Sequence, residues 1–200
     1  MLFSFPSVEL KVGERVKTRT MKASIATSLL YDIKTLKGID LKDLVDKEVV
    51  HIVTQARINA FSFVQYFCSL PGGIKTMDAA VYRIGAQTLT DVLYLLDTGQ
   101  IGELNLLVND NMFRMKPDIW ECLIYESSQR ANLSLWAQDN HAKVMVIDAL
   151  EKRFTIEGSG NLSINGHVEQ YSIFVSDELA EWHREWIRKD DIKGRKAHGK

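Results

Sequence analysis

The residues of this chain that could do chemistry begin at position 141, in the segment HAKVMVID (141–148). Polar and apolar side chains alternate in this segment, which predicts a β-strand. Successive side chains of a strand point to opposite faces, so His141 and Lys143 would lie side by side while Asp148 would point the other way. An imidazole beside an ammonium suits a phosphate, because the ring nitrogen can attack phosphorus and the cation can hold its oxygens.

A second polar segment follows at Gly158-Ser159-Gly160-Asn161. Ser159 and Asn161 are two residues apart, so they would share a face in an extended backbone. Their hydroxyl and amide would add two neutral hydrogen-bonding groups to the imidazole and the ammonium. Together the two segments predict a pocket that accepts a phosphodiester.

Each of these features has an ordinary explanation when it is taken alone. A single histidine in a strand is more often a hydrogen-bonded polar residue than a nucleophile, and Gly-Ser-Gly-Asn is a common turn sequence. His51 is expected to be hydrogen-bonded in the core, and His167 could touch either substrate or solvent. The combined spacing favours the functional interpretation, and the main alternative is an inactive relative with the same fold.

The arrangement His-x-Lys-x4-Asp followed by Gly-Ser-x-Asn resembles the HKD signature of the phospholipase D superfamily, in which an acidic residue comes next. One departure is that nine residues, 149–157, separate Asp148 from Gly158, where the family more often has a shorter spacing. We interpret the extra length as a longer hairpin. The resemblance covers roughly residues 48–190 and rests on seven positions: His141, Lys143, Asp148, Gly158, Ser159, Asn161 and Glu169.

The resemblance implies a phosphodiesterase that works without a metal or other cofactor, through a covalent phosphohistidine. Members of the family need two HKD motifs for one active site, whereas this chain contains a single copy. The resemblance therefore implies a homodimer with one composite site on its two-fold axis. His141 would be the nucleophile in one subunit and the general acid and base in the other.

The resemblance also assigns roles to the other motif positions. Lys143 and Asn161 would stabilise the charge of the transferring phosphoryl group, and Ser159 would add a hydrogen bond. Glu169 would orient an imidazole and support its protonated form. Asp148, which faces away, would hold the strand and its loop in place.

The substrate is less determined than the reaction. Small single-motif members of the family are commonly nucleases, which favours an endonuclease acting on DNA or RNA, with DNA ahead of RNA. Residues 9–22 carry a net charge of +3 and residues 188–200 a net charge of +4, which suits a polyanion but also suits a solvated tail. A lipid phosphodiesterase and a non-catalytic nucleic-acid-binding or assembly subunit are the alternatives.

Composition and motifs exclude several other classes of protein. With 46% hydrophobic and 26% charged residues, the 200-residue chain is typical of one globular domain. Its apolar runs are too short to span a membrane, and its N-terminus does not resemble a secretion signal, so no stable membrane association is expected. Cys68 and Cys122 lie in apolar helical contexts and predict core thiols in a cytoplasmic protein. The sequence has neither a Walker loop nor a cluster with zinc spacing, so a metal-dependent nuclease is poorly supported.

Strands and helices alternate between residues 49 and 137, and adjoining strands follow. This order predicts an α/β/α sandwich with a mixed, largely parallel sheet, as the phospholipase D resemblance also implies. We expect an N-terminal arm or helical extension over 1–47, with a helix near 22–36, the HKD domain over 48–190 and a basic tail over 191–200. The expected strands are 49–54, 79–84, 104–108, 132–137, 141–148, 153–157 and 171–175, and the expected helices are 59–70, 88–98, 116–129 and 177–189.

Overall fold

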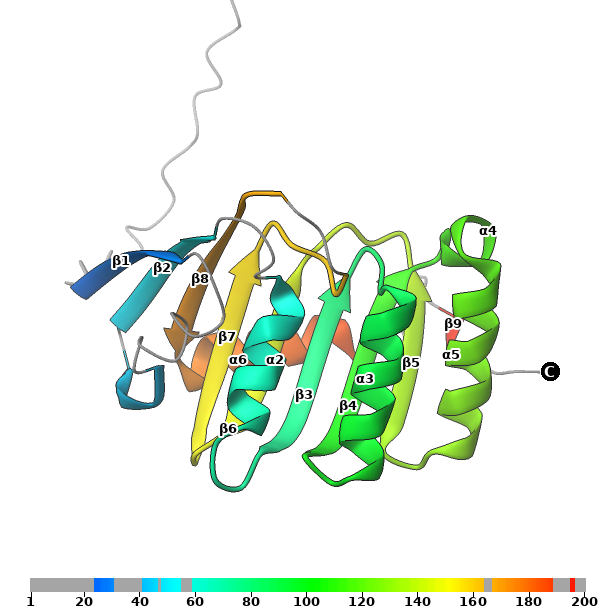
Figure 1. Ribbon diagram of the computed structural model, residues 1–200, viewed down its shortest axis with the longest axis horizontal. Coiled ribbons are helices and arrows are strands. Elements are labelled where there is room, and N and C mark those ends of the chain that lie inside the picture. Colours follow the sequence, from blue (N-terminus) through cyan, green and yellow to red (C-terminus); the bar gives the residue numbers. More distant parts are fainter. Residues whose placement is uncertain are drawn as a thin grey trace, which may run out of the picture.

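A nine-stranded sheet runs through the part of the chain that the computed structural model describes, residues 24–30, 41–46, 48–54, 59–163, 167–188 and 195–196 (Figure 1). The strand order is β1-β2-β8-β7-β6-β3-β4-β5-β9. The strands are β1 (Ser24–Leu30), β2 (Glu48–Thr54), β3 (Ile74–Val81), β4 (Ile101–Asn109), β5 (Leu133–Gln138), β6 (Val144–Ala149), β7 (Lys152–Gly158), β8 (Glu169–Val175) and β9 (Arg195–Lys196). The helices are η1 (Leu41–Asp43), α2 (Ala60–Cys68), α3 (Ala86–Asp97), α4 (Met112–Met115), α5 (Pro117–Gln129) and α6 (Asp177–Ile187).

The helices form a layer on each face of the sheet. Helices α2, α3 and α5 cover one face and α6 covers the other (Figure 1). Each helix turns an apolar stripe to the sheet, as α3 does with Leu89, Val92 and Leu96, which are all buried. Cys68 and Cys122 are free thiols that pack against the same core. The predicted α/β/α sandwich is confirmed.

The sheet is mixed, and its parallel part is smaller than we predicted. Strands β3, β4 and β5 are parallel neighbours, as the strand–helix alternation predicts, and β1 is parallel to β2. The other five pairings are antiparallel. The description "largely parallel" is therefore wrong, because β6, β7 and β8 form an antiparallel meander that lies between β2 and β3.

The extra length of the hairpin formed by β6 and β7 lies in its paired strands and not in its turn. Its turn consists of Leu150 and Glu151, whose φ angles of +53° and +57° place both residues in the left-handed region. Two such residues form the tight turn that matches the twist of antiparallel strands. The pairing runs from Ala149 with Lys152 to Val144 with Glu157. The extra residues in the motif spacing therefore lengthen the ladder, as we predicted.

The N-terminal prediction is wrong at residues 24–30. This segment is strand β1, which pairs in parallel with β2, where we expect a helix over 22–36. Without β1, strand β2 would be at the edge of the sheet with unpaired backbone groups. Pairing with β1 satisfies these groups, and this tertiary contact overrides the helix propensity of residues 24–30. The rest of the predicted helix and the arm over 1–22 lie outside the described residues. In the predicted basic tail, residues 195–196 form β9 and pair with β5.

A buried cluster of charges fixes α6 to the sheet. Asp78 in β3 is fully buried and accepts hydrogen bonds from Arg184 Nε at 2.9 Å and from Arg188 Nη2 at 2.9 Å. Arg184 also donates to Asp148 in β6 at 2.6 Å. A carboxylate removed from water needs such partners, since its burial alone is costly. The cluster thus sets the position of α6 against β3 and β6.

Candidate active site

Most of the predicted site residues meet at one edge of the sheet. The carboxyl ends of β3, β4 and β7 and the amino ends of β6 and β8 lie along this edge, at the top of Figure 1. The loop after β3 meets the loop after β7 through a bridge between Ile84 and Leu162, and Gly85 N–H donates to Leu162 O at 2.8 Å. Segments far apart in sequence are therefore brought to one place.

His141 and Lys143 lie next to each other, although not for the predicted reason. Lys143 Nζ is 3.4 Å from His141 Nδ1 and donates to His141 O at 2.9 Å. Strand β6 begins only at Val144, so the two residues lie in the loop before it. The backbone leaves the strand because Ala142 N–H donates to the Asn140 side chain at 2.8 Å. The His141 side chain is exposed, whereas Lys143 is half-buried.

Two asparagines that we did not predict as functional hold this loop. Asn140 is buried, and its amide donates to Val81 O at 3.2 Å, which ties the loop to the end of β3. The Asn109 amide, at the end of β4, donates to Asn140 O at 2.9 Å. Asn109 is the last residue of β4 and Asn140 follows β5 by two residues, and this position at strand ends on the same edge is the signal that could have identified them.

Tyr82 is a further site residue that the motif does not contain. Its ring centroid is 4.8 Å from that of His141, with the planes tilted by 52°. Lys143 Nζ lies 5.8 Å from the centroid of the same ring, within the range of a cation–π interaction. Tyr82 therefore packs against both residues of the proposed phosphate site.

Ser159 and Asn161 are held at the site by different hydrogen-bond partners. The Ser159 hydroxyl donates to the Glu169 carboxylate and accepts from Gln170 N–H at 3.0 Å. The Asn161 side-chain oxygen accepts from Arg83 N–H at 3.3 Å. The shared strand face that we predicted is absent, since β7 ends at Gly158. Glu169 is buried at the start of β8, and its charge raises the pKa of Lys143.

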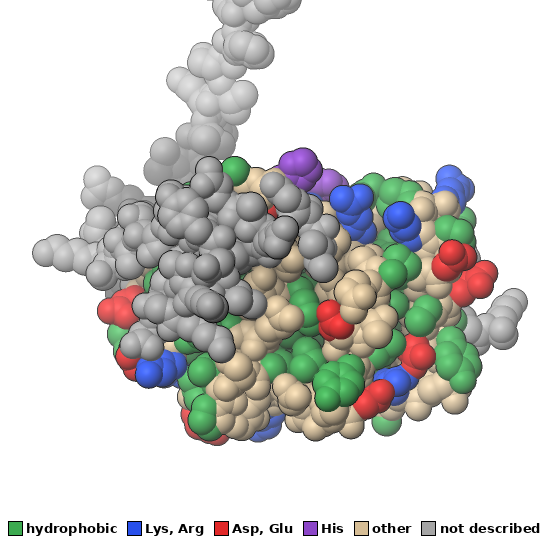
Figure 2. Space-filling view, in the orientation of Figure 1, with side chains coloured by type: hydrophobic (Ala, Val, Ile, Leu, Met, Phe, Trp, Pro, Cys, Tyr) green, Lys and Arg blue, Asp and Glu red, His purple; other side chains and the backbone are tan. Residues whose placement is uncertain are grey.

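The electrostatics of the site favour a bound anion. Burial lowers the pKa of Lys143, the nearby Arg83 guanidinium lowers this pKa further, and Glu169 opposes both effects. An ammonium that is partly removed from water beside a second cation is stabilised when a negative charge enters. Figure 2 shows His side chains at this edge with Lys and Arg side chains beside them.

Tyr171 explains why the second segment contains glycines. Its ring is buried below the loop after β7 and packs against Phe63 at 4.8 Å between centroids. A Cβ at Gly158 would collide with the Tyr171 ring, and one at Gly160 would collide with its hydroxyl. Burial, and then the charge of Glu169, raise the pKa of Tyr171, so this hydroxyl stays neutral. The absence of side chains lets the loop lie directly on the tyrosine.

Asp148 is not part of the cluster around His141. It lies near the end of β6, where it pairs with Arg153 of β7, and its carboxylate accepts a hydrogen bond from Arg184 of α6. His51 and His183 are also occupied elsewhere: His51 Nδ1 is 2.9 Å from the Ser172 hydroxyl, and His183 Nε2 is 2.8 Å from the Glu157 carboxylate. His167 is exposed. His51 is hydrogen-bonded as expected, but its side chain is only half-buried.

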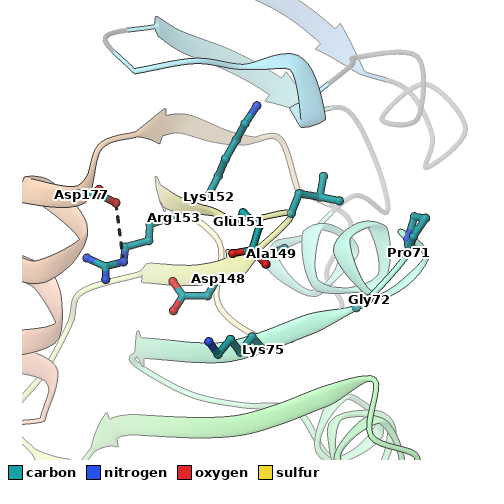
Figure 3. A pocket seen from close by; sticks show the side chains of 11 residues that line it. Pro71, Gly72, Lys75, Asp148, Ala149, Glu151, Lys152, Arg153 and Asp177 are labelled. Carbon is teal, nitrogen blue, oxygen red and sulfur yellow. Dashed lines mark ion pairs between the residues drawn. The ribbon is translucent and has the colours of Figure 1, made fainter.

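A cavity of about 370 Å³ lies at the opposite end of the sheet. It is lined by residues 71–73, Lys75, 148–153 and Asp177. Figure 3 shows Arg153 pointing to Asp177, with the two groups 3.7 Å apart. The Lys152 ammonium donates to Leu44 O at 3.0 Å. This cavity and the site around His141 are therefore separate.

Neither a protein-family model nor any curated protein matches the sequence. Solved structures do match the fold. Nuc from Salmonella typhimurium, a phospholipase D family member, is 16% identical, with 70% of this chain and 91% of that chain aligned at a TM-score of 0.53. The chain has a phospholipase D-like fold.

Two further structures agree with this assignment of the fold. NucT from Helicobacter pylori is 13% identical, with 70% of this chain and 94% of that chain aligned at a TM-score of 0.50. Phosphatidylserine synthase from Haemophilus influenzae is 12% identical, with 74% of this chain and 40% of that chain aligned at a TM-score of 0.51. At these identities the likeness shows the fold, and the chemistry must be argued from the site.

Within the described residues, His, Cys, Asp and Glu do not gather in groups of three or more that could hold a metal ion. In the same part of the chain, every helix is too short or too polar to cross a membrane.

Proposed function

We propose that this protein is a metal-independent phosphodiesterase, an endonuclease that acts on DNA or RNA, with DNA the favoured substrate. The observation that carries the proposal is the contact between Lys143 Nζ and His141 Nδ1 at 3.4 Å. This contact sets an imidazole beside an ammonium at the sheet edge where Asn161 also lies and where the Glu169 charge acts on the lysine. The phospholipase D-like fold supports the same reaction.

In the proposed reaction, His141 of one subunit attacks phosphorus and a P–N bond forms as the P–O bond to the leaving group breaks. His141 of the partner subunit gives a proton to the departing oxygen. The same partner imidazole then takes a proton from water, which attacks phosphorus and breaks the P–N bond. Lys143 and Asn161 stabilise the negative charge on the phosphoryl oxygens in both steps.

Within one chain, we assign Glu169 and Ser159 a supporting role. Their hydrogen bond joins the loop after β7 to the start of β8. The Glu169 charge raises the pKa of Lys143 and so keeps the ammonium protonated against the effect of burial. We therefore assign Glu169 to the positioning and charge balance of Lys143 as well as to the orientation of an imidazole.

The test is cleavage in the presence of EDTA. Plasmid DNA, single-stranded DNA, RNA and phosphatidylcholine vesicles are incubated with the protein and chelator. We expect cleavage of nucleic acid with EDTA present, and phosphate trapped on the protein in a form that is labile to acid and stable to base. Activity that disappears with EDTA and returns with magnesium would contradict the mechanism, and hydrolysis of the vesicle lipid alone would contradict the substrate.

The composite site is tested by mixing subunits. Wild-type protein and a His141→Asn variant are unfolded together in equal amounts and refolded, so that heterodimers form. If one site needs both imidazoles, only the wild-type homodimers are active, and activity falls to about one quarter of that of wild-type protein at the same total concentration. A value of about one half, or an active monomer in a mass measurement, would contradict the homodimer.

A further inference from the structure

Exposed aromatic and apolar side chains lie beside the candidate site on the segment after β4. The Tyr82 hydroxyl is 3.4 Å from the Met115 sulfur, while the Tyr82 ring packs against His141. Met115 is 42% exposed, and Phe113 on the same helical turn is 46% exposed. We call Tyr82, Phe113, Arg114 and Met115 the α4 strip. Single exposed apolar residues are normal on protein surfaces, but a group that adjoins a polar site indicates binding.

The α4 strip and the phosphate site are positioned by the same side chain. The oxygen of Asn109 accepts from Asn111 N–H at 2.9 Å, just before α4 begins, and the Asn109 amide donates to Asn140 O. Asn140 in turn holds the loop that carries His141. The buried Met112 anchors α4 from below. The strip therefore has a fixed position relative to the reactive imidazole.

The chemistry of the α4 strip suits the faces of nucleic-acid bases. The Arg114 guanidinium lies 5.0 Å from the centroid of the Phe113 ring, within the range of a cation–π interaction. Unpaired bases stack on such surfaces, and each stacked base adds substantially to affinity. Arg83 and Lys116, which are both exposed, can contact the phosphates between bases.

We propose that the α4 strip binds single-stranded nucleic acid, with bases stacked at Phe113 and Tyr82 while a backbone phosphate lies at His141 and Lys143. This inference rests on the proposed function and names its substrate class. In a duplex the base faces are hidden inside the stack, so the strip has nothing to contact there. An unpaired strand presents both its phosphates and its base faces.

The charge distribution also favours a single strand over a duplex. Duplex binding depends mainly on many contacts between cations and phosphates. Here the exposed Asp110 and Asp139 lie at the same edge as Arg83 and Arg114, and the net charge of the whole chain is −1. Affinity at this edge must therefore come largely from stacking.

The experiment compares Phe113→Ala with Tyr125→Ala, a matched control whose ring is 61% exposed on α5. Binding of a labelled single-stranded DNA oligonucleotide and of the same oligonucleotide in a duplex is measured in EDTA. Hydrolysis of bis(p-nitrophenyl) phosphate, a diester without bases, is measured in parallel. We expect Phe113→Ala to weaken single-strand binding roughly 5- to 100-fold, Phe113→Trp to preserve it, and Tyr125→Ala to leave it unchanged.

The outcomes separate this inference from the proposed function. Unchanged hydrolysis of the small diester together with lost single-strand binding in Phe113→Ala supports both. Equal affinity of the wild-type protein for single strands and duplexes, or unchanged binding in Phe113→Ala, overturns the inference while hydrolysis of the diester still supports the proposed function. Stacking-dependent binding without any hydrolysis overturns the proposed chemistry alone. Conversion of Phe113→Ala to a monomer would show that the strip is a subunit interface and overturn the inference.

Discussion

The two ends of the sheet differ in how they use their charged side chains. The cavity beside the β6–β7 turn is hollow, and several of its charged side chains have partners: Arg153 faces Asp177, Asp148 binds Arg184, and the Lys152 ammonium donates to Leu44 O. The edge at His141 gathers Lys143 and Arg83, two like charges; burial lowers the pKa of the lysine, Arg83 lowers it further, and Glu169 opposes both effects. Charges that are already neutralised by neighbours have little left to offer a ligand.

Under the proposed function, the volume of a cavity is a poor guide to the place of the chemistry in this fold. At the cavity end, strands begin or turn back, and the side chains there join the sheet to α6 and to the N-terminal segment. At the other end, loops leave the strands and bring side chains from β3, β6, β7 and β8 to one place. Reactivity follows the loops, which are free to place polar groups without disturbing the core.

The largest expected effect separates the two ends directly. His141→Ala removes the nucleophile, so we expect kcat for bis(p-nitrophenyl) phosphate to fall about 10⁴-fold. The matched change at the cavity end, Arg153→Ala, removes only exposed ion pairs and should leave kcat unchanged. Circular dichroism checks that both variants fold. Full activity in a folded His141→Ala protein would end the assignment of this edge as the active site.

Lys143→Ala tests the cation at the site. Loss of one charged donor to the phosphoryl group should cost roughly 3–4 kcal/mol of transition-state stabilisation, or about 10²–10³-fold in kcat/KM. Single-turnover measurements with saturating substrate show whether the loss occurs in the chemical step. If Lys143→Ala and Arg153→Ala have the same small effect, the contrast between the two ends is wrong.

Arg184→Met sharpens the comparison by changing stability without changing chemistry. It removes one of the two arginines that bind the buried Asp78, and it also removes the hydrogen-bond partner of Asp148. Arg188 still binds Asp78. We expect the free energy of unfolding to fall by about 2–3 kcal/mol, as measured by urea titration. At temperatures well below the melting transition, kcat should stay within a factor of about two. A large loss of kcat in the folded variant would mean that this cluster acts on the site.

The smallest expected effect concerns pH. Because burial lowers the pKa of Lys143 from its ordinary value of 10.5, the active ammonium is present below the lowered pKa and is lost as the pH rises through it. The alkaline fall of kcat/KM should therefore begin at a lower pH than an exposed lysine would give. Lys143→Arg should move this fall to higher pH, since a guanidinium stays charged. An alkaline limb that does not move would assign it to another group.

Elements with strong local signals were predicted closely. The apolar spacing and Pro117 predict a helix over 116–129, and α5 is Pro117–Gln129. Strand β3 begins five residues before the predicted 79–84, because the turn at 71–73 ends directly at Ile74. Strand β1 could not be predicted, because its conformation comes from pairing with β2 and not from its own residues.

The motif residues were found from sequence, but their surroundings were not. The spacing of His141 and Lys143 predicts that they are neighbours, and the structure places them together in a loop instead of a strand. Tyr82, Asn140 and Tyr171 act through contacts with segments about 11 to 59 residues away in the chain, which periodicity cannot reveal. Their roles depend on tertiary structure alone.

The strand order has a consequence for how the protein acquires its activity. Strands β2 and β3 are consecutive in the chain and are joined by α2, yet β8, β7 and β6 lie between them in the sheet. A chain that emerges from the ribosome N-terminus first therefore keeps two open strand edges until residues up to Val175 have been made. Insertion of this meander closes the sheet and, in the same event, brings the loop after β3 against the loop after β7. A nascent chain thus assembles the proposed site only when the sheet is complete, and a fragment that ends before β8 has two strand edges prone to aggregation and lacks the complete site.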